Sequence, residues 1–261
     1  MGAEVSAIRR FRGVARSLSF ATLAIAHAAS TARAEDACRF VTIGTATVRA
    51  ATDAGIVLED GRTLRLAGIE LANAADLPAG TRLTLKRLGA SPETDRYGRL
   101  NADVFIVENN AERWFQADLV ARGLARVSSR VGDPGCARLL LAKEQAARAA
   151  KLGLWGEPVY VMGKAEDPAE VLKNRGRFAL VEGRVLSVRE SGGTIYVNFG
   201  RRWSEDFTVT IAKRNERAFS AAGLTPKSLN GRRVRIRGWI EERGGPWVEA
   251  ARPEQIEILG D

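Results

Sequence analysis

Residues 94–106 read TDRYGRLNADVFI, a basic turn that leads into an apolar segment. Tyr97 and Gly98 stand in the turn, where a glycine lets the backbone bend in ways that other residues avoid. The segment that follows, 100–107, is mostly apolar and predicts a strand. Arg99 therefore stands where the turn meets the strand, and the question is which group its guanidinium holds.

The segments around this turn carry strand patterns first and helical patterns afterwards. Strand patterns lie at residues 40–70, 81–88 and 100–107, and helical patterns lie at 112–127 and 136–155. A tight Asp60-Gly61 turn divides the first β-rich run and is typical of a hairpin. Five strands followed by helices predict a small β-barrel with helical cover, so the expected fold class is mainly β with helices (α+β).

A second folding unit is expected after a break in the pattern. Residues 158–174 contain Pro, Gly and charge clusters, which are typical of a linker. Five more strand-like runs follow, with a helical piece, ERAFSAAG (216–223), between the third and the fourth. This is the element order of an oligonucleotide/oligosaccharide-binding (OB) barrel. The sequence therefore predicts a first domain at 35–157 and an OB-like barrel at 175–261.

Residues 1–34 have the pattern of a secretory signal peptide. Arginines up to Arg16 precede a short apolar run, 18–29, and a small-x-small end at Ala32-Arg33-Ala34. A membrane anchor is the alternative, but the apolar run is too short to cross roughly 30 Å of hydrocarbon. We expect cleavage near Ala34, a periplasmic or secreted protein, and no membrane segment in the mature form.

The composition is that of a globular protein with a mildly basic charge. The chain has 261 residues, 45% of them hydrophobic, which gives room for one or two packed domains. Its formal net charge is +9, but residues 1–34 hold five Arg and one Glu, so the mature form carries about +5. A charge of this size is a weak indication of a polyanionic partner such as nucleic acid.

The chain has two cysteines, Cys38 and Cys136. Export would place them in an oxidising compartment, where one intramolecular pairing is available, so we expect a disulfide. Two free buried thiols are the alternative. The single histidine, His27, lies in the signal segment, so the mature chain has no His/Cys cluster for zinc.

Four segments of the first domain together resemble the staphylococcal nuclease-like, or thermonuclease, family. They are RLAGIE (65–70), TDRYGR (94–99), ADLVARGLARV (117–127) and KLGLWGE (151–157). The resemblance covers roughly residues 40–157 and rests mainly on the first two segments taken together. It implies an OB barrel with helices and an activity that cuts nucleic-acid phosphodiesters with calcium.

The resemblance implies phosphate-binding roles for three residues. Arg65 and Arg99 match two family arginines that bind the substrate phosphate and stabilise its transition-state charge, so they are the candidate catalytic residues. A guanidinium suits this role because its fork of donors fits phosphate oxygens in two places. Tyr97 matches a tyrosine that bonds a nucleotide phosphate. The alternative is that Arg99 and Asp95 form only a solvated turn with a local ion pair.

Other positions depart from the family pattern. Ala54 stands where the first metal carboxylate is expected, so a hard cation loses an oxygen ligand. Glu70 aligns with the second metal ligand, and Leu71 replaces the threonine after it. Asn73 aligns with the general base, whose help is worth roughly 10²- to 10⁴-fold and which an amide cannot replace. We therefore expect a poor calcium site and weak or absent catalysis.

Two nearby carboxylates are candidates to restore the missing groups. Asp53 is one residue from Ala54, and Asp76 is three residues from Asn73. A shift of one residue along a strand turns a side chain to the other face, so Asp53 can act as a metal ligand only from a turn.

The second barrel carries arginines interleaved with aromatic residues. Trp239 and Trp247 lie near Arg233, Arg235 and Arg237, an interleaving typical of single-strand binding faces. Strand alternation also places these three arginines on one face, which favours a merely solvated surface as the alternative.

Three functions remain open. The preferred one is an exported thermonuclease-family protein that binds nucleic acid or oligonucleotides and cleaves them weakly or not at all. The second is an active calcium-dependent periplasmic nuclease that uses Glu70 with Asp53 or Asp76. The third is a non-catalytic envelope protein whose two barrels bind protein or glycan. The fold cannot decide among them, because such barrels host many functions.

Overall fold

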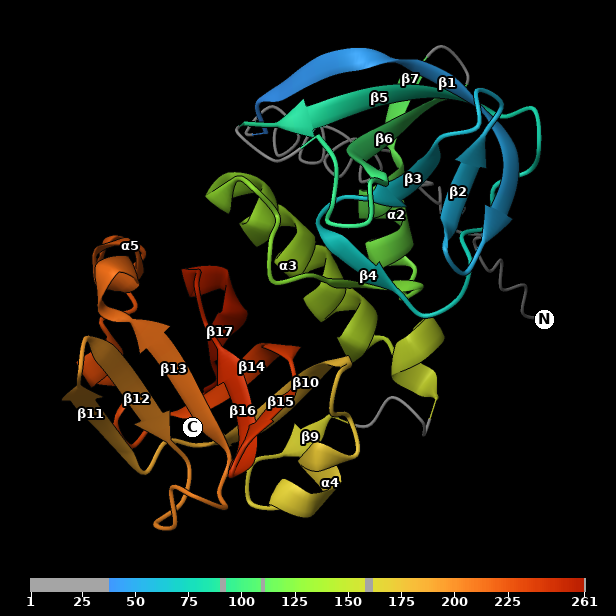
Figure 1. Cartoon of the computed structure of the whole chain (residues 1–261). Helices are drawn as coiled ribbons and strands as arrows, with labels where there is room; N and C mark the ends of the chain where they lie inside the picture. The colour runs from blue at the N-terminus through green and yellow to red at the C-terminus, as the bar shows by residue number, and fades with distance from the viewer. Residues whose placement is uncertain (1–37, 90–92, 109–110, 158–161, 261) are drawn as a thin grey trace, which may run out of the picture.

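The computed structural model describes residues 38–89, 93–108, 111–157 and 162–260, so the expected signal peptide lies outside the described residues. The elements form two lobes (Figure 1), an N-terminal lobe at residues 38–157 and a C-terminal lobe at residues 162–260. Each lobe has an apolar core of its own. Within the described ranges, no helix has both the length and the apolar character needed to cross a membrane.

Five strands of the N-terminal lobe close into a barrel. They are β1 (Phe40–Thr52), β2 (Gly55–Leu58), β3 (Thr63–Leu66), β5 (Arg82–Leu88) and β6 (Leu100–Glu108). The long β1 pairs with both β2 and β5, and β3 completes the ring by running parallel to β6. The ring therefore visits the strands out of chain order, as the Greek-key connections of an OB barrel require. The predicted barrel is confirmed, with β7 (Ala111–Trp114) added at the edge beside β6.

The barrel core is built from strands in which buried and partly exposed residues alternate. In β2 and β3, Ile56, Leu58, Leu64 and Leu66 are buried, while the residues between them are partly exposed. The Asp60-Gly61 turn joins these two strands, and Gly61 takes a φ of +85° that a side chain would strain. The hairpin expected from this dipeptide is therefore confirmed.

Helices α2 (Phe115–Ala121) and α3 (Pro134–Ala149) pack on each other beside the barrel. Asp133 caps α3, because its Oδ1 accepts the N–H of Cys136 at 2.9 Å. Cys136 forms a disulfide with Cys38, and the two Cα atoms lie 5.3 Å apart. The expected Cys38–Cys136 bridge is thus confirmed, and it ties the chain just before β1 to the first turn of α3.

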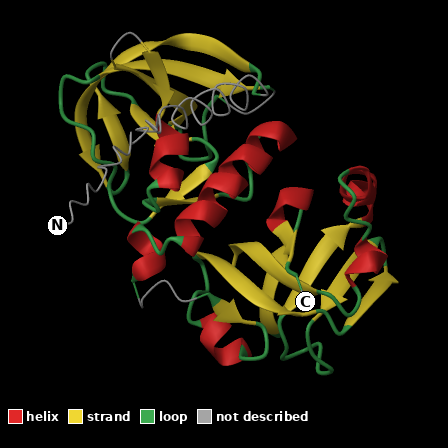
Figure 2. Ribbon diagram, turned by 180° about the vertical axis from the view of Figure 1, so that it is seen from behind, coloured by secondary structure: helices red, strands yellow, loops and turns green. Residues whose placement is uncertain are grey.

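The C-terminal lobe is also rich in β-strands, which form two sheets (Figure 2). Its strands are β10 (Phe178–Arg184), β11 (Ser187–Ser191), β12 (Thr194–Asn198), β13 (Thr208–Ala212), β14 (Arg233–Trp239), β15 (Glu241–Arg243), β16 (Gly245–Glu249) and β17 (Ile256–Ile258). β10 pairs with β14, and β13 runs parallel to β16 as β3 does to β6. Helix α5 (Glu216–Ala221) lies between β13 and β14 along the chain. The lobe is consistent with the expected OB-like domain, but its strands form a four-stranded and a five-stranded sheet where only five strands were predicted.

The segment expected to be a linker contains regular structure in its described part. Strand β9 (Gly163–Lys164) runs parallel beside β10, and helix α4 (Pro168–Leu172) follows it. Asp167 caps α4 by accepting the N–H of Glu170 at 3.2 Å. Residues 162–174 are therefore part of the C-terminal lobe's sheet and its helical cover.

The lobes meet where α3 faces β14 and β17. The side chain of Arg237 is fully buried there, and its Nη1 donates to the carbonyl oxygen of Val127 at 2.9 Å. Glu144 of α3 and Glu257 of β17 both pair with Arg237. Both interpretations of the arginine-rich strand, a ligand face or a solvated face, are therefore wrong for Arg237. Glu144, one of the two carboxylates that pair with Arg237, comes from the N-terminal lobe. The alternation of residues along a strand cannot predict a partner in another lobe.

Candidate functional site

Arg65 and Glu70 lie on two short strands joined by a tight turn. Arg65 is in β3, Glu70 is in β4 (Ile69–Leu71), and Gly68 between them takes a φ of +73°. The turn brings Arg65 Nη2 to 2.7 Å from Glu70 Oε1. The two side chains are 29% and 18% exposed, so the pair sits at the surface of the barrel with part of each group in solvent.

Arg99 is held firmly by the turn that precedes it. Asp95 Oδ1 accepts the N–H groups of Tyr97 at 2.9 Å and of Arg99 at 3.0 Å, which shapes the turn. Asp95 Oδ2 then accepts from Arg99 Nε at 2.8 Å and lies 2.7 Å from its Nη2. Arg99 Nη1 donates to the carbonyl oxygen of Ala54 at 2.7 Å. Arg99 therefore connects the 94–99 turn to the β1–β2 turn.

Asp95 acts as a permanent anion in this arrangement. Burial alone would raise the pKa of its carboxyl, but the hydrogen bonds from the Arg99 side chain and from two backbone N–H groups outweigh that effect and lower the pKa. The ion pair expected as the alternative role of Arg99 is thus present. It leaves 28% of the Arg99 side chain exposed, so pairing with Asp95 does not close the group to a ligand.

Three guanidinium groups act on the single carboxylate of Glu70. Burial raises the pKa of Glu70, while the positive charges of Arg65, Arg126 and Arg99 oppose the rise. Arg126 belongs to β8 (Ala125–Val127), whose register places it directly opposite Glu70 of β4. With Glu70 and Asp95 as the anions, this site keeps an excess of one positive charge.

Arg126 was not recognised as a site residue in the sequence, although it stands inside the ADLVARGLARV segment. Its Nη1 also donates to the carbonyl oxygen of Phe178 at 2.9 Å, at the start of β10. Arg126 therefore links the site to the C-terminal lobe. The short β4–β8 pairing that places it opposite Glu70 joins residues that are 54 to 58 positions apart, which no local pattern indicates.

Tyr97 stands beside the arginines and is open to solvent, with 67% of its surface exposed. The guanidinium carbons of Arg96 and Arg99 lie 4.8 Å and 5.5 Å from its ring centroid, within cation–π range. Among the described residues no hydrogen bond engages its hydroxyl, which can therefore meet a ligand that approaches Arg99. Of the expected phosphate-binding trio, the structure brings Tyr97 and Arg99 into contact, while Arg65 contacts Glu70 instead.

The residues present do not fit calcium. A hard cation of this type takes 6–8 oxygen ligands, many of them from carboxylates. Here Glu70 is engaged by Arg65, and the Ala54 carbonyl is engaged by Arg99. In the part of the chain that the structure describes, no group of three or more His, Cys, Asp or Glu side chains could hold a metal ion.

The candidates for restoring the lost groups are exposed and outside this network. Asp53 lies in the turn after β1, and Asn73 and Asp76 lie in the irregular segment after β4. Among the described residues, no hydrogen bond or ion pair joins any of the three to Arg65, Arg99 or Glu70. Leu71 ends β4 and is partly buried against the barrel core, so it has a packing role.

A family comparison agrees with this part of the molecule. Residues 73–157 match the family model described as staphylococcal nuclease homologue. The matched segment includes the 94–99 turn, β8 and α3, and it begins just after Glu70. No curated protein shows significant similarity to the chain.

Proposed function

We propose that this chain, which carries a staphylococcal nuclease homologue domain, binds nucleic-acid phosphodiesters through Arg65 and Arg99 and hydrolyses them weakly or not at all. The observation that carries the proposal is the pairing of Arg65 with Glu70 at 2.7 Å, with Arg126 opposite Glu70 in the β4–β8 register and Arg99 only partly covered by its pairing with Asp95. A site with more guanidinium groups than carboxylates, partly exposed, is suited to an added anion.

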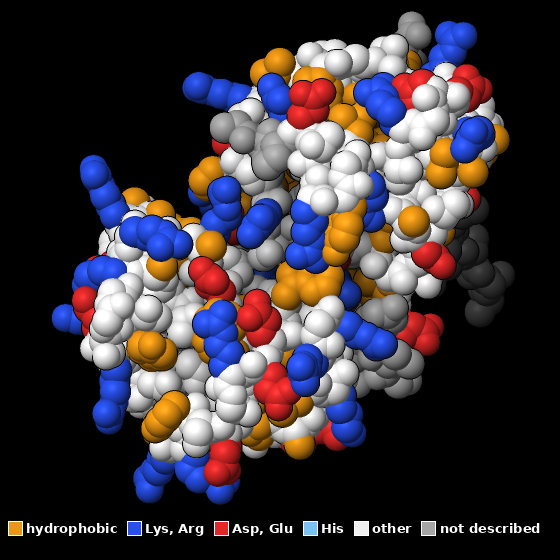
Figure 3. Space-filling model, viewed as in Figure 1, with side chains coloured by type: hydrophobic (Ala, Val, Ile, Leu, Met, Phe, Trp, Pro, Cys, Tyr) orange, Lys and Arg blue, Asp and Glu red, His pale blue; other side chains and the backbone are white. Residues whose placement is uncertain are grey.

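The two arginines contribute differently to such binding. Among the described residues, Arg65 has one polar partner, Glu70, so most of its donors are available to phosphate oxygens. Arg99 already uses Nε, Nη1 and Nη2, so it acts as a pre-oriented charge, and 28% of its side chain stays exposed to a ligand. Basic side chains are also exposed along the boundary between the lobes (Figure 3), which favours a polyanionic partner.

The site lacks two groups that efficient hydrolysis requires. With Ala54 and Asn73 in place of carboxylates, neither the metal charge nor the usual base is supplied. The alternative of an active nuclease requires Asp53 or Asp76 to move toward Glu70 when substrate binds. The alternative of an envelope protein that binds protein or glycan has no described feature in its favour.

Export is a second part of the proposal. The Cys38–Cys136 bridge supports it, because disulfides persist mainly in oxidising compartments. The periplasm, or the medium after secretion, fits both this bridge and the signal pattern of residues 1–34.

Binding and cleavage can be tested together on the purified mature protein. Fluorescence anisotropy with short single-stranded DNA and RNA, with and without calcium, should show salt-sensitive binding that calcium hardly changes. The double variant Arg65→Gln/Arg99→Gln should lose it, whereas Arg62→Gln, which removes an exposed arginine of the nearby hairpin turn, should not. Absence of binding at low salt, or equal losses in both variants, would overturn the proposal.

Cleavage of the same oligonucleotides provides the second measurement. Ala54→Asp with Asn73→Glu should raise cleavage above the wild-type rate, because metal charge and a general base act on the same transition state. If the wild type already cleaves rapidly with calcium, and Asp53→Ala or Asp76→Ala abolishes this, then the neighbouring carboxylates serve and the weak-enzyme proposal is wrong.

A further inference from the structure

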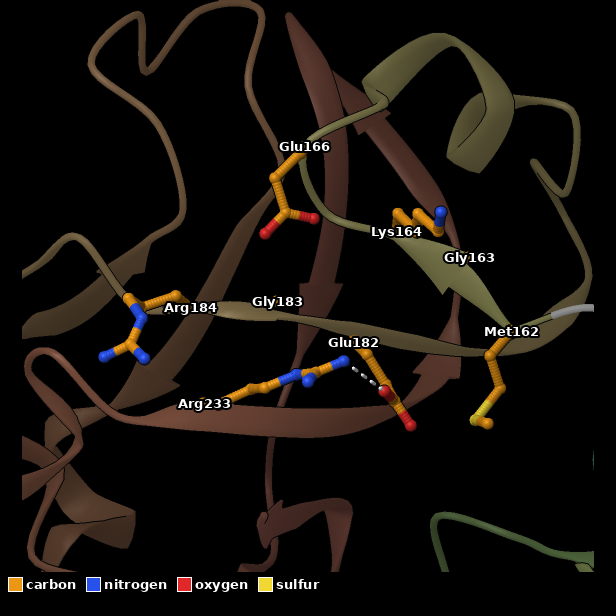
Figure 4. Close-up of a pocket in the computed structure, with 8 residues that line it drawn as sticks. All are labelled: Met162, Gly163, Lys164, Glu166, Glu182, Gly183, Arg184 and Arg233. Atoms are coloured by element: carbon orange, nitrogen blue, oxygen red, sulfur yellow. Dashed lines mark hydrogen bonds and ion pairs between the residues drawn. The ribbon is translucent and has the colours of Figure 1, made fainter. Parts of the chain in front are cut away.

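A pocket of about 520 Å³ lies in the C-terminal lobe, beside β9, β10 and β14 (Figure 4). The side chains that matter for its chemistry are Met162, Lys164, Glu166, Glu182, Arg184 and Arg233. Its volume falls within the range typical of small-molecule sites. The pocket lies in the C-terminal lobe, whereas Arg65 and Arg99 lie in the N-terminal lobe, so the two sites are separate.

The strand register concentrates positive charge in this pocket. Arg184 of β10 and Arg233 of β14 are directly opposite each other, so both side chains leave the same face of the sheet. Like charges in this position destabilise a sheet, and an anion between them would relieve the repulsion. Lys164 of β9 adds a third cation from the strand on the other side of β10.

The carboxylate of Glu182 neutralises these cations only in part, because it is shared between Arg233 and Arg235. Arg235 already holds it, with Nε 2.9 Å and Nη2 2.6 Å from Glu182 Oε1. Arg233 Nη2 reaches the other oxygen at 3.3 Å, a longer and weaker contact. The lining carries three cations, Lys164, Arg184 and Arg233, against the two acids Glu166 and Glu182. The pocket therefore has an excess of one positive charge, and Arg235 beside the lining takes up part of the Glu182 charge as well.

We propose that this pocket binds a phosphate ester of a small hydroxylated molecule, of the sugar phosphate class. Arg184 and Arg233 flank the phosphate, since two guanidinium forks match its oxygens, and Lys164 adds a point charge. Arg184 donates one N–H to the carbonyl oxygen of Gly231 at 2.6 Å, which fixes its position and leaves its other donors for the ligand.

Glu166 and Met162 define the rest of the ligand. The Glu166 carboxylate points into the pocket (Figure 4), where it accepts a hydrogen bond from a ligand hydroxyl. Met162 supplies an apolar wall, with its sulfur 3.2 Å from Arg235 Nε. No aromatic side chain lines the pocket among the described residues, so it offers no stacking surface for a nucleobase. A sugar phosphate therefore fits better than a nucleotide.

Isothermal titration calorimetry on the full mature chain tests this proposal, with ribose 5-phosphate, inorganic phosphate and ribose as probes. Ribose 5-phosphate should bind saturably, inorganic phosphate more weakly, and ribose not at all. Arg184→Gln and Arg233→Gln should each lower ribose 5-phosphate affinity by about tenfold or more, as expected for lost charged hydrogen bonds. Glu166→Gln should weaken ribose 5-phosphate binding and leave inorganic phosphate binding unchanged.

Two controls separate this pocket from other anion sites. Arg189→Gln removes an exposed arginine of β11 that does not line the pocket, and it should leave ribose 5-phosphate affinity unchanged. Arg65→Gln should also retain this affinity while its oligonucleotide affinity falls, so the two proposals fail independently. If an arginine variant does not fold, Lys164→Gln is the substitute test variant, and it should also lower ribose 5-phosphate affinity. No saturable binding of ribose 5-phosphate, or an equal loss in either control, would overturn the proposal.

Discussion

Arg237 of β14 and Glu144 of α3 form a fully buried ion pair between the two lobes. Arg237 Nη1 lies 3.0 Å from Glu144 Oε2, its Nη2 donates to Oε1 at 3.1 Å, and neither side chain has exposed surface. Glu144 Oε2 also accepts the N–H of Val127 at 2.6 Å, and Arg148 pairs with the other oxygen. Two buried charges with this many hydrogen bonds hold the lobes in one relative position.

Replacing Arg237 with leucine should strongly destabilise the protein. Removal of one partner from a buried pair costs about 3–5 kcal/mol, because the other charge stays buried without full compensation. The free energy of unfolding, measured by urea denaturation, should fall by about 3 kcal/mol or more. Arg189→Gln, an exposed arginine of the same lobe, should change it little. A loss for Arg237→Leu below about 1 kcal/mol, the value of a surface pair, would contradict this role.

Cleavage between the lobes should leave them associated. The composition of residues 158–174 predicts the first proteolytic cut in this segment, and because β9 and α4 are folded into the C-terminal lobe, we expect the cut before Met162, which would give two fragments. Because the Arg237–Glu144 and Arg148–Glu257 ion pairs join the two lobes, the two fragments should elute together in size-exclusion chromatography. Fragments of the Arg237→Leu variant should separate. A wild-type protein that resists cleavage here, or whose fragments separate at once, contradicts the prediction.

Asp103 predicts a pH dependence of stability that is unusual for a carboxylate. It lies in β6 with 3% of its surface exposed, and burial raises its pKa to about 8. A folded pKa above the unfolded value means that the folded state holds the proton more tightly. The stability from this group is therefore complete below about pH 4 and is lost as the pH rises toward 8.

Asp103→Asn should remove this dependence. The loss in the wild type is at most about 1.4 kcal/mol per pH unit within that window, and asparagine does not titrate. Urea denaturation at pH 5, 6, 7 and 8 would measure it for both proteins. If the free energy of unfolding changed with pH in the same way for both proteins, Asp103 would not be protonated in the folded state.

Export predicts a defined mature form. Cleavage after Ala34 would leave Glu35 as the first residue, and the oxidised chain would carry no free thiol because Cys38 and Cys136 are bridged. Intact mass of the protein recovered from the periplasm, with alkylation before and after reduction, would test both points. A mass that includes residues 1–34, or two thiols alkylated without reduction, would contradict them.

Local signals in the sequence were sufficient for the barrels but not for the contacts between distant segments. The Asp60-Gly61 turn and the alternation in β2 and β3 depend on neighbouring residues, so they could be predicted. Cys38 and Cys136 could be paired because no other cysteine is present. By contrast, Arg126 and Arg237 take their roles from partners more than 50 residues away. Asp103, too, is buried by the folded barrel around it.

The two candidate phosphate-binding arginines should differ when each is replaced by glutamine. Arg65 makes one ion pair and holds no backbone group among the described residues, so Arg65→Gln should lower oligonucleotide affinity without altering the fold. The loss should be roughly 1.5–3 kcal/mol, the range for hydrogen bonds to charged groups. The slope of log affinity against log salt concentration should also decrease by about one, as one phosphate contact is removed.

Arg99→Gln should lower both affinity and local order. Arg99 holds Asp95 through two nitrogens and the β1–β2 turn through the Ala54 carbonyl, so its loss frees both turns and leaves Asp95 without its cation. Amide exchange at Tyr97 and Arg99, whose N–H groups bond Asp95, should therefore accelerate in Arg99→Gln and stay unchanged in Arg65→Gln. Arg99→Lys keeps the charge but not the fork, and should recover the salt slope more than the exchange protection. Equal exchange in Arg65→Gln and Arg99→Gln, together with wild-type affinity in both, would show that these arginines serve neither the phosphate nor the turn.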